Sequence, residues 1–457
     1  MTGRRRRTID QLEAALAELV FFERASAHVL AGWIVKVPQM DLKTTLAQTF
    51  QEDIEHASEL RHRLLALAGT HGSPVRTSSS WQRLMRAVDS ARSPAELLVG
   101  LYRVVKLRLI SRYEALRSGL DPIADAPLLR SIRRILPEKR RQLAWAAAAM
   151  PRLVEAAEVR RYTAVFEAMW RDRDPAGSLP LEEALWAPVD RVRAAVRPDG
   201  LVRGTPGALR LMPLDPQRNQ HDIGVFLHGF LNEEYTTMEL ISRNSYEHPT
   251  MPWAFHLDAA RHTADEARHA RIIEQAAAQR GVKYGQYPVY TSSYDGQYEF
   301  APCEKGSRKE LLWRILLRQT FHEGLALDSL AFEVAKRKYL GQPDLAEVFR
   351  LLLADELFHA QSGLKWSRFL CGNDEAEAMR ERELAHDYLV ERAKDSRARF
   401  VAGDMNAAVA EVAHLEEVKQ HADLPLKRTA NVRARREAGF SEADIQQIVD
   451  WGYVQRA

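Results

Sequence analysis

The sequence has few of the residues that mark disulfide-rich, collagen-like or membrane-spanning proteins. Among 457 residues there are two cysteines, Cys303 and Cys371, which excludes a disulfide scaffold or a thiolate metal cluster and favours the reducing cytoplasm. The 20 prolines and 23 glycines are too few for a collagen-like chain or a chain made mostly of linkers. We expect no membrane span, because no apolar run approaches about 18 residues. We also expect no secretory signal, because the arginine-rich start leads into a polar helix.

Alternating apolar and polar stretches, which would indicate strands, are also scarce. Apolar residues make up 46% of the chain, enough for a large core, and they recur at helical spacing along most of it. We therefore predict an all-α protein. The exception is the segment 284–300, where five tyrosines occur with glycine, proline and serine, and we expect a long ordered loop there.

Proline and glycine concentrate between residues 171 and 220, which predicts a domain boundary. After Cys371-Gly372 the chain becomes strongly charged. We expect helices in this tail at 374–395, 406–421 and 442–453. The predicted parts are a helical bundle at 1–170, a linker at 171–220, a second bundle at 221–372 and a charged helical extension at 373–457.

The charges are unevenly distributed. Residues 1–170 hold 27 Lys and Arg against 18 Asp and Glu, a balance of +9, whereas the rest holds 38 against 44, a balance of −6. Solvated helix faces are the simpler explanation. The alternative is that an anionic partner, such as an acyl carrier protein or tRNA, docks on the first half.

Five Glu-x-x-His pairs occur, and this spacing places both side chains on one face of a helix, where one metal ion can bind both. Two of them, Glu266/His269 and Glu356/His359, share the longer pattern Asp-Glu-x-x-His-Ala. We interpret the pairs in the tail, Glu383/His386 and Glu411/His414, as solvated side chains.

A single glutamate precedes each of the two longer motifs at almost the same distance. Glu234 lies 32 residues before Glu266, and Glu323 lies 33 residues before Glu356. This separation fits an antiparallel helical hairpin with both residues at one height. Two hairpins would then bring four glutamates and two histidines together. Glu233 is the alternative to Glu234, because both lie near the same apolar stripe.

The pattern resembles the ferritin-like di-iron carboxylate superfamily, which includes acyl desaturases, hydroxylases of tRNA and small molecules, and N-oxygenases. The resemblance covers residues 222–370 and implies two tandem ferritin-like four-helix bundles, the first degenerate. It implies two iron ions, with manganese as an alternative, and O2 as co-substrate. The implied ligands are Glu234 and Glu323 as terminal or bridging carboxylates, Glu266 and Glu356 as bridging carboxylates, and His269 and His359, one for each metal.

Three further residues are candidates for supporting roles. Asp265 and Asp355 could each accept a hydrogen bond from the ligating histidine of the opposite helix, or they could lie on the surface. His262, one turn before Glu266, could be an extra ligand, a proton relay or a structural histidine. The loop tyrosines, from Tyr284 to Tyr298, could line an entrance, although packing of the loop is the simpler role.

The first half repeats the pattern weakly. Its candidate ligand positions hold Glu23, Asp53, His56 and Glu138. Its third helix offers Val104, Val105 or Lys106 where a glutamate is needed, and Arg141 stands where we place the second histidine. We expect a degenerate copy with a salt-bridge core that binds no metal pair and serves as a scaffold, a dimer surface or a docking platform.

The sequence thus favours an enzyme, a di-iron oxygenase or oxidase. It would hydroxylate, desaturate, N-oxygenate or cleave a small organic substrate, free or on a carrier protein, with an external electron donor. The alternatives are iron oxidation or peroxide handling without an organic substrate, and an interaction protein without activity. No nucleic-acid motif is present, so we do not expect a nucleic-acid partner. A homodimer is possible on general grounds.

Overall fold

The protein is all-α, as predicted. Within the part of the chain that the computed structural model describes, the one sheet has two short strands and the other regular elements are helices. No described helix combines the length and the apolar character needed to cross a bilayer. The described residues are 7–69, 75–172, 177–189, 194–204, 217, 219–291, 294, 303–401 and 424–455, with backbone only at 393 and 395–401.

The chain folds into two compact units. The first comprises Met1–Val192 and Ser242–Arg261, and the second comprises Arg193–Ile241 and His262–Ala457. The break near residue 192 falls inside the predicted linker. The assignment of residues 242–261 to the first unit differs from the predicted division at 221, because the end of one long helix and the start of the next pack with the first unit.

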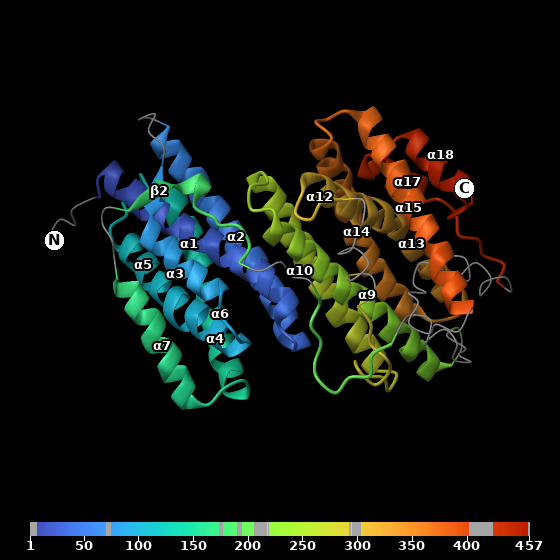
Figure 1. Ribbon diagram of the computed structural model, residues 1–457, viewed down its shortest axis with the longest axis horizontal. Helices are drawn as coiled ribbons and strands as arrows, with labels where there is room; N and C mark the ends of the chain where they lie inside the picture. Colours follow the sequence, from blue (N-terminus) through green and yellow to red (C-terminus); the bar gives the residue numbers. More distant parts are fainter. Residues whose placement is uncertain are drawn as a thin grey trace. The chain divides into compact units, whose positions relative to one another are not determined.

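In the first unit α1 and α2 form a long helical hairpin, with α5 and α6 packed against it (Figure 1). The short strands β1 and β2 pair antiparallel, with Thr77 opposite Leu179. The elements are α1 (Ile9–Lys36), α2 (Met40–Ala68), β1 (Arg76–Ser78), α3 (Ser79–Asp89), α4 (Pro94–Leu98), η1 (Val99–Lys106), α5 (Leu107–Ser118), α6 (Ala126–Ala149), η2 (Met150–Arg152), α7 (Ala156–Arg171), β2 (Ser178–Pro180) and η3 (Leu181–Glu183).

In the second unit α14 packs against α13 and η4, and the C-terminal helices cover α13 and α14 (Figure 1). The elements are α9 (Gln220–Glu247) and α10 (Trp253–Ala278), both of which also contribute to the first unit, α12 (Arg308–Arg314), η4 (Ile315–His322), α13 (Glu323–Tyr339), α14 (Pro343–Leu370), α15 (Glu375–Val401), α17 (Val432–Ala438) and α18 (Glu442–Asp450).

Several helices begin at hydroxyl side chains that satisfy free backbone N–H groups. Thr8 accepts from the Gln11 amide at the start of α1, Ser93 accepts from the Glu96 amide at α4, and Ser307 accepts from the Glu310 amide at α12. Each such cap is worth about 1 kcal/mol. The local sequence therefore fixes where these helices begin.

A π-helical segment occurs inside one helical run of each unit, η1 between α4 and α5 in the first and η4 between α12 and α13 in the second. π-helical turns are rare and frequently lie at functional sites. In the second unit α14 approaches η4 closely at Gly363, where an added Cβ would lie 2.5 Å from the carbonyl carbon and oxygen of Gln319. Because those are backbone atoms, only glycine permits this approach.

The charged tail is folded over part of its length. The predicted helices at 374–395 and 442–453 correspond to α15 and α18, and the predicted helix at 406–421, with the Glu411/His414 pair, lies outside the described residues. The interpretation of His386 as a solvated side chain was wrong. It is 8% exposed, and its ring stacks on Trp451 with centroids 3.6 Å apart, because the C-terminal segment folds back onto α15.

Candidate metal centre

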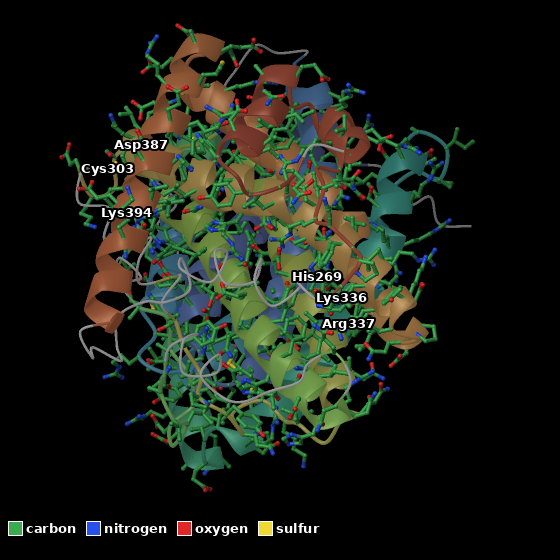
Figure 2. All side chains as sticks on the ribbon, turned by 90° about the vertical axis from the view of Figure 1, so that its right-hand side faces the viewer. His269, Cys303, Lys336, Arg337, Asp387 and Lys394 are labelled. Carbon is green, nitrogen blue, oxygen red and sulfur yellow. The ribbon has the colours of Figure 1, made fainter. Side chains whose placement is uncertain are left out.

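The six predicted ligands converge inside the second unit. All six are buried, and Figure 2 shows His269 among the helices, whereas Asp387 and Lys394 lie on the exposed side of α15. Four helical segments supply the side chains: Glu234 comes from α9, Glu266 and His269 from α10, Glu323 from the first residue of α13, and Glu356 and His359 from α14.

Two of the glutamates each face both histidines. Glu266 places Oε2 3.7 Å from Nδ1 of His269 and Oε1 3.3 Å from Nδ1 of His359. Glu356 places Oε1 3.9 Å from Nδ1 of His269 and Oε2 3.2 Å from Nδ1 of His359. A carboxylate with one oxygen toward each of two imidazole nitrogens has the geometry of a bridging ligand between two cations.

Glu234, not Glu233, belongs to the cluster. Its Oε2 lies 3.5 Å from Nδ1 of His269, whereas the Glu233 side chain is 30% exposed and lies 3.7 Å from the guanidinium of Arg318. The adjacent glutamates point apart because consecutive residues of a helix lie about 100° apart around its axis.

On the other side of the cluster, Glu323 and His262 complete a second group of ligand atoms. Nε2 of His262 lies 3.1 Å from Oε1 of Glu266 and 3.9 Å from Oε1 of Glu323, and its ring stacks on His359. Potential ligand atoms of these four residues lie within 4.8 Å of one another, as do those of Glu234, Glu266 and His269. His262 thus belongs to a group of side chains that could hold a metal ion.

Two residues of η4 that the sequence reasoning missed contact the cluster. Nε of Arg318 lies 3.3 Å from Oε1 of Glu323, and the side-chain amide of Gln319 lies 3.4 Å from Nδ1 of His262. The signal for them was a pair of polar residues inside an otherwise apolar helical run. Their position follows from the π-helical turn directly before Glu323.

In both His269 and His359, the ring nitrogen that points away from the glutamates, Nε2, faces an aspartate of the opposite helix. Nε2 of His269 lies 2.9 Å from Oδ2 of Asp355, and Nε2 of His359 lies 3.5 Å from Oδ2 of Asp265. Arg268 bridges the two aspartates, at 2.7 Å from each. A carboxylate on the outer nitrogen orients the ring and fixes the tautomer that leaves Nδ1 free to bind a cation.

The cluster carries more negative charge than a buried site tolerates. Burial and the neighbouring carboxylate of Glu266 raise the pKa of Glu234, and burial together with Glu356 raises the pKa of Glu323. Burial lowers the pKa of His359, but Glu356 and Asp265 outweigh it and raise the pKa to about 10. All three shifts arise because buried carboxylates repel one another and are stabilised by nearby positive charge.

Two divalent cations fit this arrangement. They would supply the positive charge that the four carboxylates need beyond Arg318, which lies 3.3 Å from Oε1 of Glu323. Nδ1 of His269 is buried and makes no hydrogen bond within the described part of the chain. Carboxylate and imidazole ligands suit iron or manganese. Glu234, Glu266, Glu356 and His269 could hold one ion, and Glu266, Glu356, Glu323, His359 and His262 could hold the other.

The loop tyrosines pack against α9. The hydroxyl of Tyr290 donates to the Gly229 carbonyl at 2.8 Å, and the ring of Tyr284 stacks on His228, whose Nε2 accepts from the Gly285 amide at 3.0 Å. These contacts hold the described residues 284–291 of the loop against α9. Tyr298 lies outside the described residues.

The first unit has a salt-bridge core at the corresponding place. The ammonium of Lys139 contacts Glu23 and lies 2.6 Å from Asp53, and Lys106 lies 2.7 Å from Asp53. All four side chains are fully buried. Burial alone raises the pKa of Glu23, but Lys139 and His56 outweigh it and lower the pKa to about 2.

The cations of this core are Lys139 and Lys106, and not the predicted Arg141. Arg141 is 57% exposed and pairs with Glu52 at the surface, whereas Lys139 and Lys106 point inward. The prediction chose residues one position away from the inward face of α6. Glu138 does not lie at a ligand position either, because it contacts Nε2 of His56 at 2.6 Å from the outer side.

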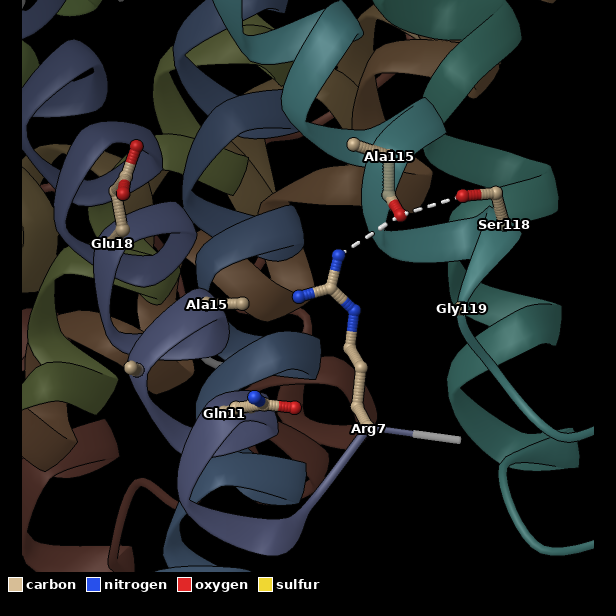
Figure 3. Close-up of a pocket in the computed structure, with 8 residues that line it drawn as sticks. Arg7, Gln11, Ala15, Glu18, Ala115, Ser118 and Gly119 are labelled. Carbon is tan, nitrogen blue, oxygen red and sulfur yellow. Dashed lines mark hydrogen bonds between the residues drawn. The ribbon is translucent and has the colours of Figure 1, made fainter. Parts of the chain in front are cut away.

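A surface hollow in the first unit has a volume of about 510 Å³ and lies between α1 and the end of α5 (Figure 3). In it Arg7 donates to the Ala115 carbonyl at 3.1 Å. No imidazole or carboxylate pair lines it, so it offers no set of ligands or catalytic groups. The lining residues are Arg7, Gln11, Ala14, Ala15, Glu18, Ala115, Ser118 and Gly119.

A family model described as "Protein of unknown function (DUF455)" matches residues 156–446, more than half of the chain. The chain belongs to this DUF455 family. The match covers all six predicted ligands and leaves out α1 to α6, so the part of the chain that the DUF455 model describes carries the candidate metal centre. Comparison with curated proteins and with solved structures gives no match.

Proposed function

We propose that the second unit is a di-iron carboxylate enzyme of the ferritin-like type that activates O2 to oxidise a small organic substrate. The observation that carries this proposal is the bridging geometry. Glu266 and Glu356 each direct one oxygen to His269 and the other to His359. A structural salt-bridge cluster does not require that two carboxylates be shared between the same two imidazole nitrogens.

Two bound ferrous ions would supply electrons for the reduction of O2. The residues of the chain hold and orient the ions: Asp355 and Asp265 fix the histidine rings, and the buried carboxylates supply negative charge that favours the metal. Burial of the ligands keeps bulk water from the reacting atoms. Hydroxylation, desaturation, N-oxygenation and oxidative C–C cleavage are all compatible with this site.

The enzyme would need an external electron donor, and its substrate would be free or attached to a carrier protein. We place the activity in the cytoplasm, because the thiols of Cys303 and Cys371 are both unpaired, as expected in a reducing compartment. The cluster contains only carboxylates and imidazoles, so manganese is the alternative metal.

The test is metal analysis after anaerobic loading with ferrous iron. We expect two iron ions for each wild-type chain and loss of both in Glu266→Ala, because Glu266 faces both histidines. Glu347→Ala is the matched control, since Glu347 lies on the ligand helix α14 but pairs with Arg350 at the surface. A folded wild-type protein that retains no iron would exclude the proposal.

Oxygen consumption separates the possible outcomes. Uptake of O2 by the loaded wild-type protein, coupled to an oxidised organic product, supports an oxygenase or oxidase. Uptake without any product points to iron oxidation or peroxide handling instead. Iron binding without O2 uptake contradicts the proposed activity.

A further inference from the structure

The centre of the first unit repeats the outer contacts of the candidate metal centre. Glu138 contacts Nε2 of His56 at 2.6 Å, as Asp355 contacts Nε2 of His269 at 2.9 Å. In addition, Gln142 on α6 donates to Glu52 on α2 at 2.8 Å, and His359 on α14 faces Asp265 on α10 in the second unit. The outer contacts that orient the ligands are therefore present in the first unit.

Half of an inner ligand set is present as well. Glu23, Asp53 and His56 place potential ligand atoms within 4.8 Å of one another, as Glu234, Glu266 and His269 do. Nδ1 of His56 is buried, lies 3.7 Å from Glu23 and makes no hydrogen bond within the described residues. It is thus directed into the centre in the same way as Nδ1 of His269.

The other half of the set is replaced. Lys139 and Gln142 on α6 have the i, i+3 spacing of Glu356 and His359. Lys106, the last residue of η1, lies 2.7 Å from Asp53, much as Glu323, the first residue after η4, lies in one group of potential ligand atoms with Glu266 and His359. Lys106 also donates to Gln142 at 2.9 Å. A glutamate, a histidine and a second glutamate are thus exchanged for two ammonium groups and an amide.

The exchange keeps the charge balanced. Two buried carboxylates, Glu23 and Asp53, face two buried ammonium groups, whereas the four carboxylates of the second unit have one guanidinium, that of Arg318, beside them and need further positive charge. The ammonium of Lys139, between Glu23 and Asp53, stands where a divalent ion would bind both. The first unit therefore carries its cations as side chains.

We propose that the centre of the first unit is a dinuclear metal site in which Lys106 and Lys139 replace the metal ions, so that Lys106→Glu, Lys139→Glu and Gln142→His together would restore binding of divalent metal. This inference rests on the proposed metal centre of the second unit. It makes the first unit independent of metal and confines metal dependence to the second unit.

The first experiment counts metal in a chain whose second site has been removed by Glu266→Ala and Glu356→Ala. With Mn²⁺ as the probe, we expect no bound ion in this background and two bound ions after the three restoring substitutions. A control with Lys106→Met and Lys139→Met removes the cations without adding ligands and should bind none. Restored variants that bind no Mn²⁺, or that stay unfolded with Mn²⁺ present, would overturn the inference, as would Mn²⁺ bound by the first unit before restoration.

The second experiment uses the wild-type protein and hydrogen exchange with and without a chelator. We expect removal of metal to reduce amide protection in α13, α14 and residues 262–278, while protection in α1, α2 and α6 stays unchanged. Equal loss in both units contradicts the inference. A wild-type chain that binds no metal at all is a failure of the proposed function, which the restored variants still distinguish from a failure of this inference.

Discussion

Asp355 on α14 lies 2.9 Å from Nε2 of His269 on α10, and this contact directs the opposite ring nitrogen into the cluster of glutamates. The contact joins two helices and fixes the imidazole from its outer side. Asp265 and His359 repeat it in the reverse direction, at 3.5 Å. The orientation of both candidate ligands therefore depends on residues that would not touch the metal.

Asp355→Asn should weaken metal binding without removing a ligand. Loss of the carboxylate partner of a ligating histidine typically lowers metal affinity by about 10- to 100-fold. Isothermal titration with Mn²⁺ measures the change. Arg268→Ala is the control, because it removes the exposed partner of Asp355 and leaves His269 in contact with the carboxylate. Equal losses in the two variants would contradict a role through His269.

Gly363→Ala should destabilise the second unit and disturb the metal centre. The new Cβ would lie 2.5 Å from backbone atoms of Gln319, so α14 or η4 would have to move. Such overpacking costs about 1–3 kcal/mol of unfolding free energy. Ser362→Ala, the neighbouring buried residue, is the matched control. We expect a lower free energy of unfolding, measured with denaturant, and a lower metal content in Gly363→Ala, and neither change in Ser362→Ala.

Two buried histidines should make the first unit sensitive to mild acid. Burial lowers the pKa of His28 to about 3, with further contributions from His256 and Arg24, and burial also lowers the pKa of His256 to about 3. Both are neutral in the folded state. Their stabilisation is complete above the unfolded pKa of about 6.5 and is lost as the pH falls from there towards 3.

Replacement of His28 tests this pH dependence. Between pH 6.5 and 5 the unfolding free energy of the wild type should fall more steeply than that of His28→Gln, by about 1.4 kcal/mol for each pH unit. Carboxylates such as Glu23, with a pKa of about 2, stay ionised in the folded protein over this range. Denaturant unfolding at several pH values measures the slopes, and parallel slopes would contradict the assignment.

Arg435→Met should release the C-terminal helices from the second unit. Nε of Arg435 on α17 lies 3.1 Å from Oδ2 of Asp328 on α13, and both groups are buried. Removal of one partner leaves an uncompensated buried charge, at a cost of about 3–5 kcal/mol. Arg433→Met, at an 89% exposed neighbour, should change stability little. Thermal unfolding of both variants provides the comparison.

Most of the ligand cluster was predictable, because Glu-x-x-His spacing and equal separations along the chain translate directly into positions on helices. For this reason the side chain of Glu234, and not that of Glu233, lies beside His269, and Asp355 lies 2.9 Å from the other ring nitrogen of that histidine. In the first unit, the same reasoning chose Arg141 and missed Lys139. A weakly repeated sequence fixes the rotation of a helix to no better than one residue, or about 100°.

The sequence by itself determined that the chain is all-α and which carboxylates and imidazoles share a helix face, because both follow from local spacing. Only the tertiary structure decided which charges meet across helices. It brought Arg318 and Gln319 to the cluster through a π-helical turn, and it buried His386 beneath the C-terminal segment. Such contacts depend on how helices distant in sequence pack together, and no pattern within a single helix encodes that packing.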